Sequence, residues 1–209
     1  MKTAMSRFVM ILTTLMLSTN LLAQNQDSFD RFFLQPKVGV NIATITNGGE
    51  CNPRIGGVFG LELEYKPESF FGVSVGVNYS MQGDKTSKNY QRIGMVKAVE
   101  RIDYITFPVL GVMNIANSGV ALKFGIQPAF NVLANISISS GGQSKTYSFK
   151  KLGITIDEME FSIPFGISYT APNGISIEAR YNMGVSEVVN NTDLRNCVFS
   201  FTLGRKFEL

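Results

Sequence analysis

The chain has no histidine, only two cysteines, and no apolar run after residue 23 that is long enough to cross a bilayer as a helix. Histidine is the commonest metal ligand and the commonest general base at neutral pH, so we expect no metal, no cofactor and no enzymatic activity. A membrane-spanning helix needs about 20 apolar residues. Any membrane insertion of the remaining chain must therefore use β-strands.

The first residues have the pattern of a secretory leader. Lys2 and Arg7 precede an apolar stretch over residues 8–22 that is too short and too polar to span a membrane. We predict that residues 1–23 form a cleavable signal peptide and that residues 24–36 form a short periplasmic segment.

Net charge is small. The formal charge of the chain is +3, and it falls to +1 once Lys2 and Arg7 leave with the leader. A nearly neutral chain argues against nucleic-acid binding.

Alternation of apolar and polar residues with period two is the strongest pattern in the sequence, because successive side chains of a strand point to opposite faces. It is clearest over residues 71–81, 159–169 and 175–186. Five further segments are weaker candidates: 37–43, 58–65, 102–114, 121–133 and 198–207. The pattern predicts eight strands.

The connections between these segments alternate in length. Short turns rich in Pro, Asn, Ser and Gly follow the second, fourth and sixth segments, at residues 66–69, 116–119 and 171–174. Longer polar loops follow the odd segments, at residues 47–55, 82–101, 137–158 and 187–196. Outer-membrane barrels have this asymmetry, with tight periplasmic turns and long outer loops. The sequence therefore predicts an all-β fold, a single antiparallel up-and-down transmembrane β-barrel of eight strands over residues 37–209.

Three prolines fall inside the predicted strands. Pro108, Pro128 and Pro164 each remove a backbone donor from the ladder. We expect a β-bulge at each of them.

Composition indicates which face meets lipid. The apolar face is almost free of charge, and a charge near the bilayer midplane costs about 2–4 kcal/mol. Arg205 is the exception, close to a strand end where the cost falls to about 0–1 kcal/mol. Aromatic residues gather beside the short turns, as in an interfacial girdle: Tyr65, Phe70, Phe71, Tyr169 and Phe207.

The opposite face is assigned to the lumen. It carries four acids and four bases among Gly, Ser and Asn: Lys37, Glu62, Glu64, Lys123, Glu160, Glu178, Arg180 and Lys206. The interior of an eight-stranded barrel is only wide enough for side chains. We expect these charges to pair with one another and to leave no open pore.

Several segments together resemble the outer-membrane β-barrel domain of Bacteroidetes that includes PorT-like proteins. They are the leader end Leu22-Ala23-Gln24 and residues 104–110, 124–128, 174–181 and 199–207, so the resemblance covers most of residues 37–207. It implies an outer-membrane location, insertion by the barrel-assembly machinery, and an accessory role in export or surface assembly beside secretion-system components.

Two further features are hypotheses for sites. Cys51 and Cys197 lie in the first and last outer loops, which become neighbours when a barrel closes, so they could form a disulfide or remain two free thiols. The loop over residues 82–101 is basic and could face lipopolysaccharide, because clustered Lys and Arg attract phosphate; a solvated loop is the alternative. Its basic residues are Lys85, Lys88, Arg92, Lys97 and Arg101.

Three functions fit these observations. The first is a non-enzymatic outer-membrane barrel with a structural, surface-interaction or export-accessory role. The second is a narrow channel or small-ligand carrier. The third is a soluble, secreted, lipocalin-like barrel whose apolar face turns inward.

Overall fold

The computed structural model describes residues 31–46, 51–86, 97–116, 118–140, 143–153, 156–188 and 194–209. The predicted signal peptide lies outside the described residues. Twelve strands and one short 3-10 helix are formed within them. The elements are β1 (Arg31–Thr46), β2 (Cys51–Lys66), β3 (Phe71–Gln82), β4 (Asp84–Thr86), β5 (Lys97–Thr106), β6 (Val109–Ile115), β7 (Val120–Ser140), β8 (Gln143–Ser148), η2 (Phe149–Leu152), β9 (Met159–Thr170), β10 (Ile175–Gly184), β11 (Arg195–Arg205) and β12 (Phe207–Glu208).

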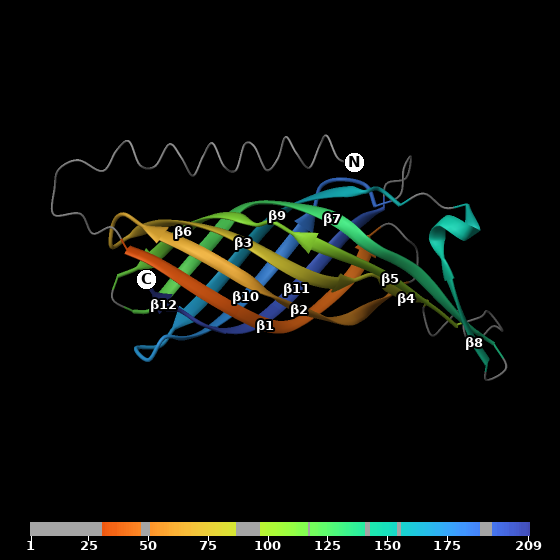
Figure 1. Cartoon of the computed structure of the whole chain (residues 1–209), viewed down its shortest axis with the longest axis horizontal. Coiled ribbons are helices and arrows are strands. Elements are labelled where there is room, and N and C mark those ends of the chain that lie inside the picture. Colours follow the sequence, from red (N-terminus) through yellow and green to blue (C-terminus); the bar gives the residue numbers. More distant parts are fainter. Residues whose placement is uncertain are drawn as a thin grey trace.

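The strands form one antiparallel sheet that closes on itself. Strand β1 pairs with β2 on one side and with β11 on the other, so that Val40 lies opposite both Gly57 and Phe201. Figure 1 shows the strands tilted around a common long axis. Closure pairs the backbone groups of the first and last wall strands, which satisfies them where no water is present.

The predicted number of strands is wrong, because ten strands form the wall of the barrel. Gly83, with φ of 122°, separates β3 from β4. Phe107 and Pro108 separate β5 from β6. Both β3 and β4 pair with β2 and β5, and both β5 and β6 pair with β3 and β7. One additional strand therefore comes from the interruption of the predicted segment 102–114, and the other, β4, lies within the predicted loop 82–101.

The prolines are accommodated in a different way from the one expected. Pro108 interrupts the wall, whereas Pro128 and Pro164 lie inside β7 and β9 without a shift of register at either residue. The register shift in β7 lies instead between Asn131 and Leu133. The carbonyls of Pro108 and Pro128 still accept hydrogen bonds, from the N–H groups of Gly76 at 2.9 Å and of Phe107 at 2.8 Å.

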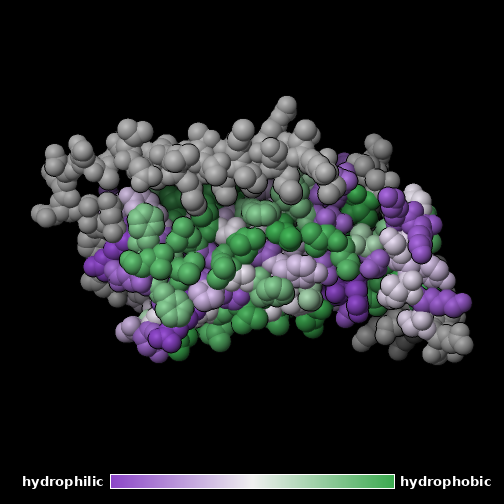
Figure 2. Space-filling model, viewed as in Figure 1, coloured by the Kyte–Doolittle hydropathy of each residue, from purple (hydrophilic) through white to green (hydrophobic). Residues whose placement is uncertain are grey.

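The two faces of the wall are those predicted by composition. Apolar side chains point outward and are exposed, for example Val38 (60%), Leu61 (47%) and Ile177 (55%). Figure 2 shows hydrophobic residues across the middle of the wall and hydrophilic residues toward both ends. The inward positions of the same strands are polar and buried. A soluble barrel with its apolar face turned inward is therefore the wrong interpretation.

Aromatic side chains mark the end with the short turns. Phe32 stacks on Tyr65 with ring centroids 4.9 Å apart, and Phe70, Phe71, Tyr169 and Phe207 are exposed on the outer face. Arg205 lies 5.2 Å from the centre of the Phe207 ring. Its charge thus lies among the interfacial aromatic residues and away from the apolar belt, by which we mean the exposed apolar side chains across the middle of the wall.

Several strands extend beyond the predicted boundaries, and two of these extensions change the ends of the barrel most. Strand β1 begins at Arg31, where it pairs with Lys66, so residues 31–36 belong to the barrel and not to the segment that precedes it. Residues 137–158, predicted as a loop, contain the end of β7, all of β8 and η2. The β7–β8 hairpin projects from the end of the barrel opposite the C-terminus (Figure 1).

An apolar cluster lies where η2 meets the barrel. Phe149 of η2 is buried with wall residues and with Val188 of the last long connection. The wall residues of the cluster are Ile45, Ile102, Tyr104 and Ala129. The hairpin is thus anchored by an inward-packed side chain at its base. Among the described residues, no helix is long and apolar enough to cross a membrane.

We expect the cost of a charge on the outer face to depend on its height along the wall. Leu61→Arg places a cation within the apolar belt and should lower the free energy of unfolding by about 2–4 kcal/mol, measured by urea titration in lipid vesicles. Ile175→Arg, at the start of β10 beside a short turn, is the matched control and should cost about 0–1 kcal/mol. Equal costs at both positions would contradict the assignment of this belt to lipid.

Candidate functional site

Five charged side chains from four strands meet at one height in the lumen. Lys37 comes from β1, Glu62 from β2, Lys123 from β7, and Glu178 and Arg180 from β10. Each occupies an inward position, and each residue is at most 6% exposed. We call these five residues the lumen cluster.

Glu62 is the centre of the lumen cluster. Lys37 Nζ donates to Glu62 Oε2 at 2.6 Å, Arg180 Nη2 donates to the same oxygen at 3.0 Å, and Lys123 Nζ donates to Glu62 Oε1. Glu178 completes the cluster, with Oε1 at 2.5 Å from Arg180 Nη2 and Oε2 at 3.0 Å from Lys123 Nζ. Each of the two carboxylates thus has a cationic partner on both of its oxygens, and buried charges require such pairing.

Glycines make room for these long side chains. Gly166 on β9 lies opposite both Lys123 and Arg180 in the two neighbouring ladders. A Cβ atom at Gly166 would lie 3.5 Å from Cγ of Arg180. On β11, Gly204 lies opposite Lys37, and a Cβ there would lie 3.2 Å from Cβ of Lys37. Large charged residues therefore alternate with glycine around the lumen at this height.

The remaining predicted lumen charges lie elsewhere along the axis. Lys206 Nζ donates to Glu64 Oε2 at 2.7 Å, a second pair at the short-turn end. Glu160 accepts from Asn196 Nδ2 at 3.2 Å and has no ion pair with a described residue. Glu160 is six residues along β9 from Gly166, about 20 Å from the lumen cluster. The predicted set of four acids and four bases is thus divided among three separate places.

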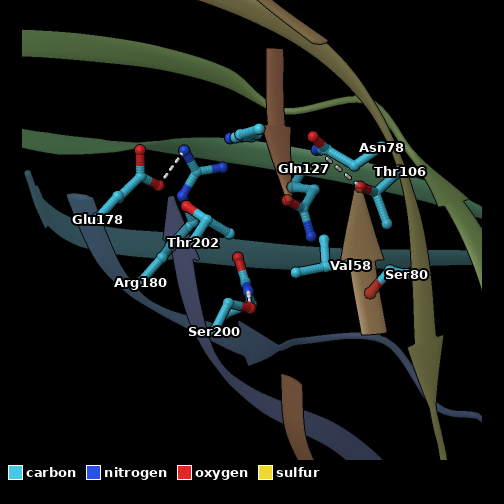
Figure 3. A pocket seen from close by; sticks show the side chains of 11 residues that line it. Val58, Asn78, Ser80, Thr106, Gln127, Glu178, Arg180, Ser200 and Thr202 are labelled. Atoms are coloured by element: carbon cyan, nitrogen blue, oxygen red, sulfur yellow. Dashed lines mark hydrogen bonds and ion pairs between the residues drawn. The ribbon is translucent and has the colours of Figure 1, made fainter. Parts of the chain in front are cut away.

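A small cavity adjoins the lumen cluster. It has a volume of about 20 Å³ and is lined by Lys37, Glu178 and Arg180 and otherwise by Val58 and neutral polar residues. Figure 3 shows Glu178 and Arg180 facing Asn78, Ser80 and Thr106 across this space. Such a volume holds about one water-sized particle, so the cavity is no pathway through the barrel.

Sequence reasoning did not single out a network of neutral polar residues that fills the lumen beyond the cavity. Asn41 Nδ2 donates to Ser80 Oγ at 2.9 Å, and Ser200 Oγ donates to Asn41 Oδ1 at 2.7 Å. The pair Arg54 Nη1 and Asp103 Oδ1, at 3.6 Å, was also missed. The alternation pattern could have identified Asn41, Ser80 and Ser200 as inward residues. The hydrogen-bond partners of these residues depend on the register between distant strands, which the pattern does not give.

The two remaining predicted sites are only partly described. Cys197 has a free thiol, and the side chain of Cys51 lies outside the described residues, so their disulfide stays a prediction. In the basic loop, Lys88, Arg92 and the side chain of Lys97 also lie outside the described residues. Of the other two loop residues, Arg101 is exposed on β5 and Lys85 is half-buried on β4.

The described residues offer no obvious metal centre. No group of three or more Cys, Asp or Glu side chains within them is arranged to hold a metal ion. The chemistry of the lumen is therefore that of ion pairs, amides and hydroxyls.

Removing the central carboxylate should unbalance the lumen cluster. Glu62→Gln keeps the shape but leaves three buried cations to share Glu178, and we expect a loss of about 3–5 kcal/mol in the free energy of unfolding. Urea titration in lipid vesicles measures it. The control is Glu68→Gln in an exposed short turn, which should change the value by less than about 0.5 kcal/mol. Equal stability of the two variants would show that the ion pairs contribute little.

Comparison with proteins of known structure identifies the same fold. Ail of Yersinia pestis, solved in complex with the heparin analogue sucrose octasulfate, is 16% identical; the match covers 84% of this chain and 99% of Ail with a TM-score of 0.53. Neisserial surface protein A is 15% identical over 84% of this chain and 97% of its own, with a TM-score of 0.48. The N-terminal β-barrel domain of Pseudomonas aeruginosa OprF is 9% identical over 87% and 100%, with a TM-score of 0.45.

A search of curated proteins finds no match. The model of one family, described as the outer membrane protein beta-barrel domain, matches residues 22–190. These residues include the strands from β1 to β10, which carry the whole lumen cluster. The chain belongs to the outer membrane protein beta-barrel domain family, and its place is the outer membrane.

Proposed function

We propose that this protein is a non-enzymatic outer-membrane barrel that anchors an interaction surface, with the wall as the anchor and the projecting strands as the surface. The observation that carries the proposal is the filled lumen. At the height of the lumen cluster the interior is occupied by its five side chains, whose residues are at most 6% exposed. A barrel that is filled in this way leaves its outer end as the part available to partners.

The outer end has features of a presented surface. Strand β7 continues beyond its pairing with β9 and is bordered by β5 on one side and by β8 on the other, up to Ser139. Residues 144–147 of β8 are exposed. Ser137 and Ser139 share hydrogen bonds with Thr146 (2.9 Å) and Ser144 (3.2 Å), which bind the hairpin strands together. The hairpin thus has its own hydrogen bonds and its own anchor at Phe149.

The absence of catalysis is part of the proposal. The chain has no histidine, and the buried acids of the lumen cluster are each held by cations. A carboxylate held in this way is a poor general base, because its lone pairs are already engaged. A role as an accessory to export at the cell surface, which the likeness to PorT-like proteins of Bacteroidetes implies, fits the same architecture and belongs to the proposal.

A channel is the alternative function, and conductance separates the two. Purified protein in planar bilayers should give no stable unitary currents, since the ion pairs and the apolar cluster around Phe149 fill the lumen. Inserted protein is verified by a shift in gel mobility on boiling. Reproducible current steps from protein that shows this shift would favour the channel.

Lipopolysaccharide is the proposed partner of the basic loop. Arg101 and Lys85 lie on β5 and β4, on the side of the apolar belt that carries the projecting strands. Guanidinium and ammonium groups at this height can bind the phosphates of the outer leaflet. Ail, which has the same fold, was solved in complex with the heparin analogue sucrose octasulfate, and this complex supports an anionic partner as part of the proposal.

Neutralising the basic loop should reduce lipopolysaccharide binding. A variant with Lys85, Lys88, Arg92, Lys97 and Arg101 all changed to Gln should retain several-fold less lipopolysaccharide after detergent extraction, measured per barrel. A control with Lys66→Gln and Arg205→Gln changes charges at the opposite end and should retain the native amount. An unchanged amount in the five-residue variant would contradict this partner.

A further inference from the structure

The lumen cluster carries more positive than negative charge. Lys37, Lys123 and Arg180 supply three cations, and Glu62 and Glu178 supply two carboxylates. Within the described residues, these cations form ion pairs with no other acid. The formal charge of the lumen cluster is therefore +1.

Neighbouring charges do not cancel this excess. Glu64 is paired with Lys206, so this pair adds no net charge. Glu160 lies about 20 Å away along β9. Arg54 and Asp103 form a further balanced pair. A buried unit charge without a counterion is costly at low dielectric, and this cost favours a bound anion.

The cavity lies beside this excess charge and has unused hydrogen-bonding capacity. Arg180 lines it and is 5% exposed, and its Nε–H has no partner among the described residues. Lys37 lines the cavity too, and its ammonium has donors beyond the one used for Glu62. Hydroxyl groups of Thr106 and Thr202 are further donors on the wall.

Two side-chain amides in the cavity can present either an acceptor or a donor to a bound ion. Asn78 and Asn182 line it, and each has a buried Oδ1 without a partner among the described residues. The Nδ2 group of Asn182 holds its present acceptors at 3.4–3.5 Å, long for hydrogen bonds. Rotation of this amide would exchange these two long contacts for an NH₂ group that faces the cavity, which would add a donor to the site.

We infer that this cavity binds one small monovalent anion of about the size of chloride. The sign follows from the +1 charge of the lumen cluster and from the free Nε–H of Arg180. The size follows from the volume of about 20 Å³, which is the room that about one water-sized particle needs, so that a single small ion fits the cavity. The bound anion would neutralise the lumen cluster and so stabilise the closed lumen.

The test is refolding into lipid vesicles in sodium chloride or in sodium gluconate at the same ionic strength. Gluconate is too large for the cavity and serves as the non-binding anion. Chloride should raise the midpoint of the heat-induced mobility shift by about 2–4 °C at a fixed heating rate. Lys37→Met brings the formal charge of the lumen cluster to zero, so the chloride effect should disappear.

Lys145→Met on the exposed hairpin is the matched control and should keep the chloride effect of the native protein. Equal midpoints of the native protein in the two salts would overturn the inference, and so would an undiminished chloride effect in Lys37→Met. Crystals of the native protein in bromide provide a second test that needs no variant. An anomalous peak beside Arg180 and Lys37 supports the site, and a cavity without bromide refutes it.

Discussion

Backbone hydrogen bonding in lipid is the constraint on which the rest of the structure depends. Strands in a bilayer have no water to satisfy their free edges, so the sheet must close, and here β1 joins β11 over ten residue pairs from Lys37 to Thr46. Closure divides every wall strand into a face toward lipid and a face toward the lumen. The long ladders of this barrel then set the height at which each inward side chain lies.

The lumen cluster follows from that division. A narrow barrel keeps inward polar groups out of bulk water, so most of them bond to partners at their own height. Four strands contribute to the lumen cluster, and glycines at Gly166 and Gly204 leave space for the long side chains of Lys123, Arg180 and Lys37. The lumen thus resembles a protein core built from charges and amides. Its polar partners are specific, and this specificity holds the strands in one register.

The end of the barrel that carries the projecting strands needs no apolar outer face, because it lies beyond the apolar belt. There β7 continues as a hairpin with β8, and hydroxyl pairs replace apolar contacts along part of it. Phe149 returns to the barrel and packs with Ile102 and Tyr104, so the projecting strands are tied to the wall by an apolar contact. The base of the hairpin is therefore fixed to the barrel, and its tip is available to partners.

The sequence alone determined the two faces of the wall and the short turns near residues 66–69, 116–119 and 171–174, because both follow from the two-residue period of a strand and from local turn chemistry. It could not determine the interruptions at Gly83 and Pro108, the extension of β1 to Arg31, or the strand nature of residues 143–148, since these depend on pairing with neighbouring strands. It also identified the charged residues of the lumen without their partners. Glu62 lies 116 and 118 residues from Glu178 and Arg180 in the chain, and only the registers of β1, β2, β7, β9 and β10 bring them to one height while leaving Glu160 about 20 Å away. Contacts between distant strands are properties of the closed sheet, so the tertiary structure alone decided which charges meet.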